Sequence, residues 1–226
     1  MLDKLNCIKD FNRALREVIL LVWMAKRDEK DFKRYKTNPI LKSSLVLLVS
    51  KFESFLENSV EEYITIINQN SITIPEKLLL CHSEECLEKL KNKQENEKIA
   101  IFKSIKQLWN NENVQLNISN KFDYGKHGHK SINKLFSKIG FDNIMDSLKI
   151  FDKSSSFAED NVKEEIDFKA KLNEIICKRN NIIHEDASLS FTPVEIAKYI
   201  FYFHQFSMQL EQVLRKELMR MLPSEN

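Results

Sequence analysis

Glycine is scarce in this chain, which has three glycines among 226 residues. Glycine-rich loops bring backbone amides against phosphates in P-loop and dinucleotide-binding proteins, and three glycines cannot build them. Any phosphate chemistry must therefore use side chains. Long apolar runs are missing as well, because the most apolar N-terminal run, Val18 to Ala25, is far shorter than the roughly 20 residues of a membrane-spanning helix. We expect this run to form a core helix.

Neither sign of charge dominates the sequence. Its 35 basic and 33 acidic residues nearly cancel, so no overall field draws it to nucleic acid or membrane, and any basic surface must be local. Four cysteines in a chain of this size, with no cleavable signal expected, are typical of reduced thiols and not of a disulfide framework. We therefore expect a cytoplasmic protein. No motif in the sequence predicts a cofactor, so none is expected.

Apolar residues recur at helical spacing along most of the chain, and no stretch alternates over strand length, so the predicted fold class is all-α. We expect one domain over residues 1–226, with an insertion at about 70–156. The predicted helices cover about residues 2–31, 39–69, 75–93, 98–109, 131–140, 162–184 and 192–221. In the first of them, Phe11, Leu15, Val18, Ile19, Val22 and Trp23 are expected to share the buried face.

Several residues predict where helices begin and end. Pro39 disfavours helix at the residue before it and suits a first turn, so "KTNPIL" is expected to separate the first two helices. Ser131 is predicted as an N-cap and Gly140 as a stop for the short helix of the insertion. Thr192, followed by "PVE", is a strong start signal for the last helix. The aromatic run of that helix, which includes His204, predicts burial in the core or against a second subunit.

The stretch "CKRNNIIHED" places polar residues where the helical pattern calls for packing. Arg179 falls in the core register, four residues after Ile175, and an arginine there is costly unless it is paired or lines a cleft. On the adjacent stripe Asn173, Cys177, Asn180 and His184 follow at spacings of four, three and four, so their side chains lie on neighbouring turns.

These residue types suit the cleavage of a phosphodiester without a metal. Arg179 offers a forked, permanently charged donor set for phosphate oxygens, and His184 can accept or give a proton near neutral pH. Asn180 would hold the imidazole or the phosphate, and an RNA 2′-hydroxyl would supply the nucleophile. The structural alternative is equally simple: a histidine that complements a helix end and an arginine in a core ion pair.

At these residues the sequence resembles a known family. "RNNIIH" fits the R-x4-6-H signature of HEPN domains, near the end of the penultimate long helix. "SKFESFLENSVEEY" and "SINKLFSKIGF" resemble the RiboL-PSP-HEPN branch, so the resemblance spans roughly residue 43 to the C-terminus. The family implies a helical bundle and a homodimer that unites two motifs in one composite cleft.

The resemblance also implies an activity. HEPN proteins are usually metal-independent endoribonucleases that leave 2′,3′-cyclic phosphate ends, in toxin–antitoxin or antiphage roles, so a cognate antitoxin or regulatory protein is an expected partner. By this resemblance Arg179, Asn180 and His184 form the catalytic site. Some family members are inactive and serve as dimerisation or binding modules. That alternative stays open, as does a structural helical adaptor in which Arg179 is a core ion pair.

Basic residues near the motif and in the insertion are candidates for RNA contacts. Lys126 and Lys130 flank "HGH" in a predicted loop, Lys121 and Lys134 lie nearby, and Lys178 precedes Arg179. We predict Lys126, Lys130 and Lys178 as substrate-binding residues, with a solvated loop as the alternative.

Two further sets of polar residues are weaker candidates. His127 and His129 have no third ligand at a usual spacing, so no metal site is predicted. Glu53 and Glu57 of the second helix are candidate acidic contributors to the site, but their register favours a solvent-exposed surface.

Overall fold

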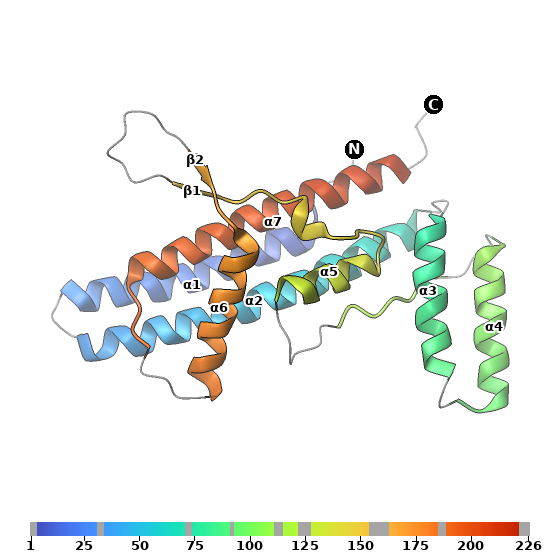
Figure 1. Ribbon diagram of the computed structural model, residues 1–226, viewed down its shortest axis with the longest axis horizontal. Coiled ribbons are helices and arrows are strands. Elements are labelled where there is room, and N and C mark those ends of the chain that lie inside the picture. The colour runs from blue at the N-terminus through green and yellow to red at the C-terminus, as the bar shows by residue number, and fades with distance from the viewer. Residues whose placement is uncertain are drawn as a thin grey trace.

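The computed structural model describes residues 4–30, 34–70, 74–90, 93–110, 115–121, 128–153, 163–184 and 189–221. It is dominated by helices, which confirms the predicted all-α class (Figure 1). The elements are α1 (Asn6–Lys30), α2 (Arg34–Gln69), α3 (Glu76–Lys89), α4 (Glu95–Trp109), α5 (His129–Ser137), the short 3₁₀ helix η2 (Ile144–Asp146), β1 (Phe151–Lys153), β2 (Lys163–Glu165), α6 (Phe168–His184) and α7 (Pro193–Met221).

The three longest helices, α1, α2 and α7, lie side by side, and α6 crosses over them (Figure 1). Their shared core is rich in aromatic rings: Phe52 of α2 stacks on Phe203 of α7 with ring centroids 4.2 Å apart. Phe168, the first residue of α6, packs edge-on against Phe203 at 6.3 Å. The ring cluster therefore fixes the N-terminal end of α6 on the bundle.

The start of α2 differs from the prediction. The helix begins at Arg34 and continues through Pro39, so "KTNPIL" does not separate two helices. Tertiary contacts support these first turns. The side-chain Nδ2 of Asn38 donates to the Leu189 carbonyl at 2.9 Å, and its Oδ1 accepts from the Phe191 backbone amide at 3.2 Å. Local preference was outweighed by packing.

The start of α6 also differs. Residues 162–167 were expected to be helical, but β2 pairs with β1 as an antiparallel ribbon, and the helix begins only at Phe168. Asp167 accepts a hydrogen bond from the Ala170 amide at 3.0 Å, which is the contact of an N-cap. Most of the predicted linker, residues 154–161, lies outside the described residues.

The other helix ends give a mixed result. Thr192 caps α7 as predicted, since its hydroxyl accepts from the Glu195 amide at 3.1 Å. Gly140 ends the turn after α5 with a φ of 92°, a value that favours glycine. Ser131, in contrast, lies inside α5, whose N-cap is Gly128.

The predicted buried face of α1 is only partly buried. Ile19 and Trp23 are 51% and 57% exposed, although Leu15, Val18 and Val22 are buried as expected. Among the described elements, α1 packs mainly on α2 and α7, so its buried stripe is narrower than the apolar pattern suggests. No described helix is both long and apolar enough to span a bilayer.

Candidate functional site

Arg179 lies where α6 crosses α2. Its Nη2 atom is 3.7 Å from Oε2 of Glu53 on α2, and its side chain is 16% exposed. Nη1 donates to Asn180 Oδ1 at 2.9 Å, while the buried Nε has no hydrogen-bond partner among the described residues. The guanidinium is thus oriented from two sides and keeps one N–H unsatisfied, which is rare for a buried donor.

Glu53 is the site residue that sequence reasoning misjudged. The polar side of α2 was expected to face solvent, but Glu53 is 8% exposed because α6 covers α2 there. Glu57, one turn further, is partly buried. The signal that could have found Glu53 was Arg179 itself, since a cation in a core register requires an acidic neighbour.

Asn180 and His184 share one stripe of α6, as the spacing predicts. Asn180 is half-buried beside Arg179, and His184 is exposed at the last residue of the helix. His184 makes no hydrogen bond or ion pair within the described part of the chain. Ile183, next to it, is 45% exposed. The helix end therefore presents a base and an apolar side chain to solvent.

Lys178 contacts α7, whereas Arg179 contacts α2. Its ammonium lies 2.7 Å from Glu195 Oε1 and 2.8 Å from Glu174 Oε1, and it donates to the Tyr199 hydroxyl at 2.8 Å. Burial alone would lower the pKa of Lys178, but the hydrogen bonds to Glu174, Glu195 and Tyr199 outweigh burial and raise the pKa above its ordinary value. This geometry favours a role in fixing α6 on α7 over the predicted contact with substrate.

The lysines of the insertion were the other predicted substrate contacts. Lys126 lies outside the described residues, as does His127, whereas Lys130 is exposed in the first turn of α5. Lys121 and Lys134 are exposed as well. His129 lies against α6: Asn173 Nδ2 is 3.1 Å from His129 Nδ1. α5, which falls in the predicted insertion, thus reaches the helix that carries the motif.

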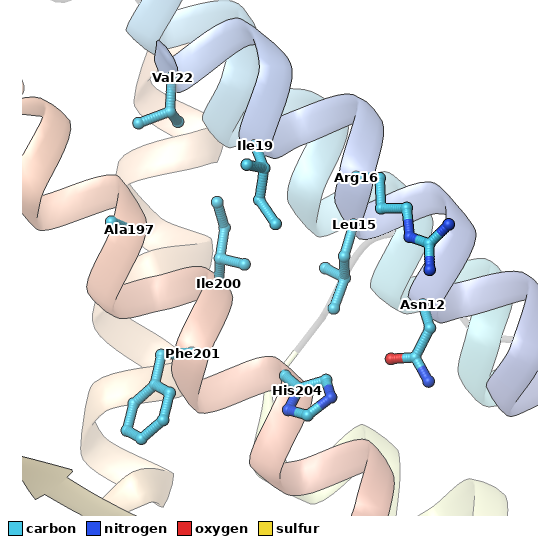
Figure 2. Close-up of a pocket in the computed structure, with 9 residues that line it drawn as sticks. All are labelled: Asn12, Leu15, Arg16, Ile19, Val22, Ala197, Ile200, Phe201 and His204. Atoms are coloured by element: carbon cyan, nitrogen blue, oxygen red, sulfur yellow. The ribbon is translucent and has the colours of Figure 1, made fainter. Parts of the chain in front are cut away.

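A separate groove of about 600 Å³ runs between α1 and α7 (Figure 2). Its lining is mostly apolar, with Leu15, Ile19 and Ile200 in the middle and Arg16 and His204 toward one end (Figure 2). His204 is exposed there, so it does not belong to the core. The residues described as lining this groove come from α1 and α7, and the motif of α6 lies elsewhere.

The fold and the arrangement at Arg179 define a class of protein. An all-α bundle with an arginine, a following asparagine and a histidine near the end of its penultimate long helix is of the HEPN type. The sequence model of the RiboL-PSP-HEPN family matches residues 9–216, so the chain belongs to this family. No curated protein and no solved structure gives a significant match.

Proposed function

We propose that the protein is a metal-independent endoribonuclease with Arg179, Asn180 and His184 as its catalytic residues. The observation that carries this proposal is the orientation of the Arg179 guanidinium by Glu53 and Asn180, close along the helix to an exposed histidine. The buried Nε–H of Arg179, which has no partner among the described residues, supports the proposal because a phosphate oxygen would satisfy it. Membership of a HEPN family supports the same activity.

The chemistry follows from these three side chains. The 2′-hydroxyl loses its proton to His184, and its oxygen attacks the adjacent phosphorus. The bond from phosphorus to the 5′-oxygen breaks, and the leaving oxygen takes a proton. The products are a 2′,3′-cyclic phosphate and a 5′-hydroxyl. Arg179 stabilises the negative charge that develops on the phosphoryl oxygens, and Asn180 positions Arg179 through their hydrogen bond.

The proposed active form is a homodimer in which two motifs share one cleft. Within one chain, His184 has no partner among the described residues, and exposed Ile183 next to it offers an apolar contact. A second copy would bring the proton donor for the leaving oxygen. The groove between α1 and α7 is on a different part of the surface and stays available to a regulatory protein or antitoxin in the proposed toxin or antiphage role.

Three proteins test the proposal: wild type, Arg179→Ala and His184→Ala, each incubated with total RNA in EDTA. We expect the wild type alone to cut RNA. Circular dichroism and thermal unfolding show whether the variants stay folded. Equal cutting by wild type and both folded variants would overturn the proposal, because the motif would then be unnecessary.

Mixing the two inactive variants tests the composite cleft. Random exchange of subunits creates heterodimers in which one intact arginine and one intact histidine lie on different chains. Partial recovery of cleavage on mixing supports a shared site. Wild type that cuts RNA as a monomer in light-scattering chromatography would contradict it.

The second candidate is an inactive dimerisation or binding module, and the Arg179 to Glu53 ion pair favours it specifically. In that case Arg179 has a structural role, and RNA stays intact with wild type. Arg179→Ala would then lower stability without any change in RNA. The same three proteins therefore separate both candidates.

A further inference from the structure

The N-terminal end of α5 packs closely against α6. The His129 amide donates to Asn173 Oδ1 at 3.4 Å, and Asn173 Nδ2 lies 3.1 Å from His129 Nδ1. A Cβ atom at Gly128 would come within 2.8 Å of Asn173 Oδ1, so a glycine permits this approach. When Asn173 donates to Nδ1, the His129 Nε2 atom carries the proton and is a donor for another group.

Asn173 belongs to the same stripe of α6 as Asn180 and His184. Asn180 and His184 follow it by seven and eleven residues, close to two and three turns of about 3.6 residues each. The distance from Asn173 to His184 along the axis is about 16 Å at about 1.5 Å per residue. Cys177, also exposed, lies between them. The α5 contact and the motif are thus the two ends of one polar track.

Uncompensated positive charge gathers at the α5 end of this track. Lys130 and Lys134, one turn apart on α5, are exposed and form no ion pair with a described carboxylate, and the same holds for Lys121. Three lysines elsewhere in the insertion and on α6 are paired, in contrast: Lys138 with Glu85 at 3.0 Å, Lys149 with Glu165 at 3.3 Å, and Lys171 with Glu174 at 2.6 Å.

Residues 116–119, which precede Lys121, are held in place by several hydrogen bonds. The Ser119 amide donates to Glu85 Oε2 at 2.8 Å, and the Asn117 amide donates to His82 Nδ1 at 3.2 Å. The Leu116 amide donates to Asn68 Oδ1 at 2.8 Å. These contacts fix residues 116–119 on α2 and α3, so Lys121 follows an anchored segment.

We propose that single-stranded RNA lies along this track, with its scissile phosphate at Arg179 and His184 and a more distant part at the start of α5. His129 Nε2 would donate to a nucleotide there, and Lys130 and Lys134 would contact phosphates. Stacked nucleotides are spaced by about 3.4 Å along one strand and extended ones by more, so 16 Å corresponds to roughly two to five nucleotides. The inference rests on the proposed ribonuclease activity and adds that a good substrate must be long enough to reach from the motif to α5.

Two substrates test this length requirement. One is a dinucleotide, which cannot reach α5 from the motif. The other is an octanucleotide of deoxynucleotides with a single ribonucleotide in the middle, so that cleavage is confined to one position. We expect wild type to have a higher kcat/KM for the octanucleotide. Lys130→Ala/Lys134→Ala and His129→Ala should reduce that advantage severalfold, measured as the ratio of kcat/KM for the octanucleotide to kcat/KM for the dinucleotide.

The matched control is Lys98→Ala/Lys103→Ala. These lysines are exposed on α4, which packs on α3 away from α6 (Figure 1), and they too form no ion pair with a described carboxylate. The control should keep the full octanucleotide advantage. The proposed RNA track is wrong if both α5 variants keep the higher kcat/KM for the octanucleotide, or if the control variant loses it equally.

Binding separates failure of the track from failure of the proposed activity. An all-deoxy octanucleotide has no 2′-hydroxyl and cannot be cut by this route, so its binding is measured by fluorescence anisotropy over a range of salt concentrations. Each phosphate contact contributes about 0.7 to the slope of log affinity against log salt concentration. Lys130→Ala/Lys134→Ala loses two contacts, so its slope should be shallower than that of wild type by about 1.4. If nothing is cleaved but this slope falls, the activity is wrong and the track stands. If cleavage occurs with an unchanged slope and ratio, the track is wrong and the activity stands.

Discussion

Replacing Glu53 by glutamine should uncouple Arg179 from α2. At 3.7 Å, two unit charges attract by about 4.5 kcal/mol for an effective dielectric constant near 20. Desolvation offsets much of this for a pair that is nearly buried, and removal of one partner from a fully buried pair costs about 3–5 kcal/mol. Because Arg179 keeps some exposure, we expect a coupling energy of about 1–3 kcal/mol.

A double-mutant cycle measures this coupling. Urea unfolding is followed for wild type, Glu53→Gln, Arg179→Met and the double variant, which isolates the pairwise contribution to the free energy of unfolding. Glu53→Gln should also lower kcat for RNA cleavage with little change or a decrease in KM, because the cleft loses a negative charge while the guanidinium loses its orientation. A coupling energy near zero, with unchanged kcat, would refute the idea that Glu53 positions Arg179.

Three other predictions use different parts of the molecule. A maleimide should modify exposed Cys177 well before Cys7, because burial raises the pKa of the Cys7 thiol to about 12. Single-stranded RNA that lies along α6 should slow the modification of Cys177. Equal rates with and without RNA would argue against this contact. Burial alone would raise the pKa of Glu174, but hydrogen bonds from Lys171 and Lys178 lower it to about 2. The contribution of Glu174 to stability is therefore complete above about pH 4.5 and is lost as the pH falls towards 2. After allowance for solvent screening, wild type should lose about 1 kcal/mol more of its free energy of unfolding over this pH range than Glu174→Gln does. An equal loss in both proteins would contradict this. Thr192→Ala should lower the free energy of unfolding by about 1 kcal/mol through loss of the α7 cap, measured by urea unfolding, whereas a neutral change would show that the cap contributes little.

The long helices were predictable because their apolar spacing and terminal signals agree. Thr192 and the "PVE" that follows it placed the start of α7 correctly, and apolar residues at helical spacing predicted most of α2. Pro39 misled the prediction, because Asn38 and the chain before α7 stabilise turns that the local sequence disfavours. Local preferences of a few tenths to a few kcal/mol yield to such contacts.

The site was predictable along α6 but not across helices. Spacing on one helix fixes which side chains are neighbours, so Arg179, Asn180 and His184 could be grouped from the sequence alone. The crossing point of α6 on α2 depends on packing that no local pattern encodes, and Glu53 was therefore assigned to solvent. The contact of His129 with Asn173 was missed for the same reason, since the two residues are 44 positions apart.

The most direct test of the central claim is the identity of the cleavage product. Wild type in EDTA is given an oligonucleotide with one ribonucleotide among deoxynucleotides, and the fragments are weighed by mass spectrometry. Attack by the 2′-hydroxyl predicts one cut immediately 3′ of the ribose, with a 5′ fragment that is one water lighter than the linear phosphate, and no such fragment with His184→Ala. A linear 5′-phosphate on the downstream fragment, or cutting at the deoxynucleotides, would contradict the account.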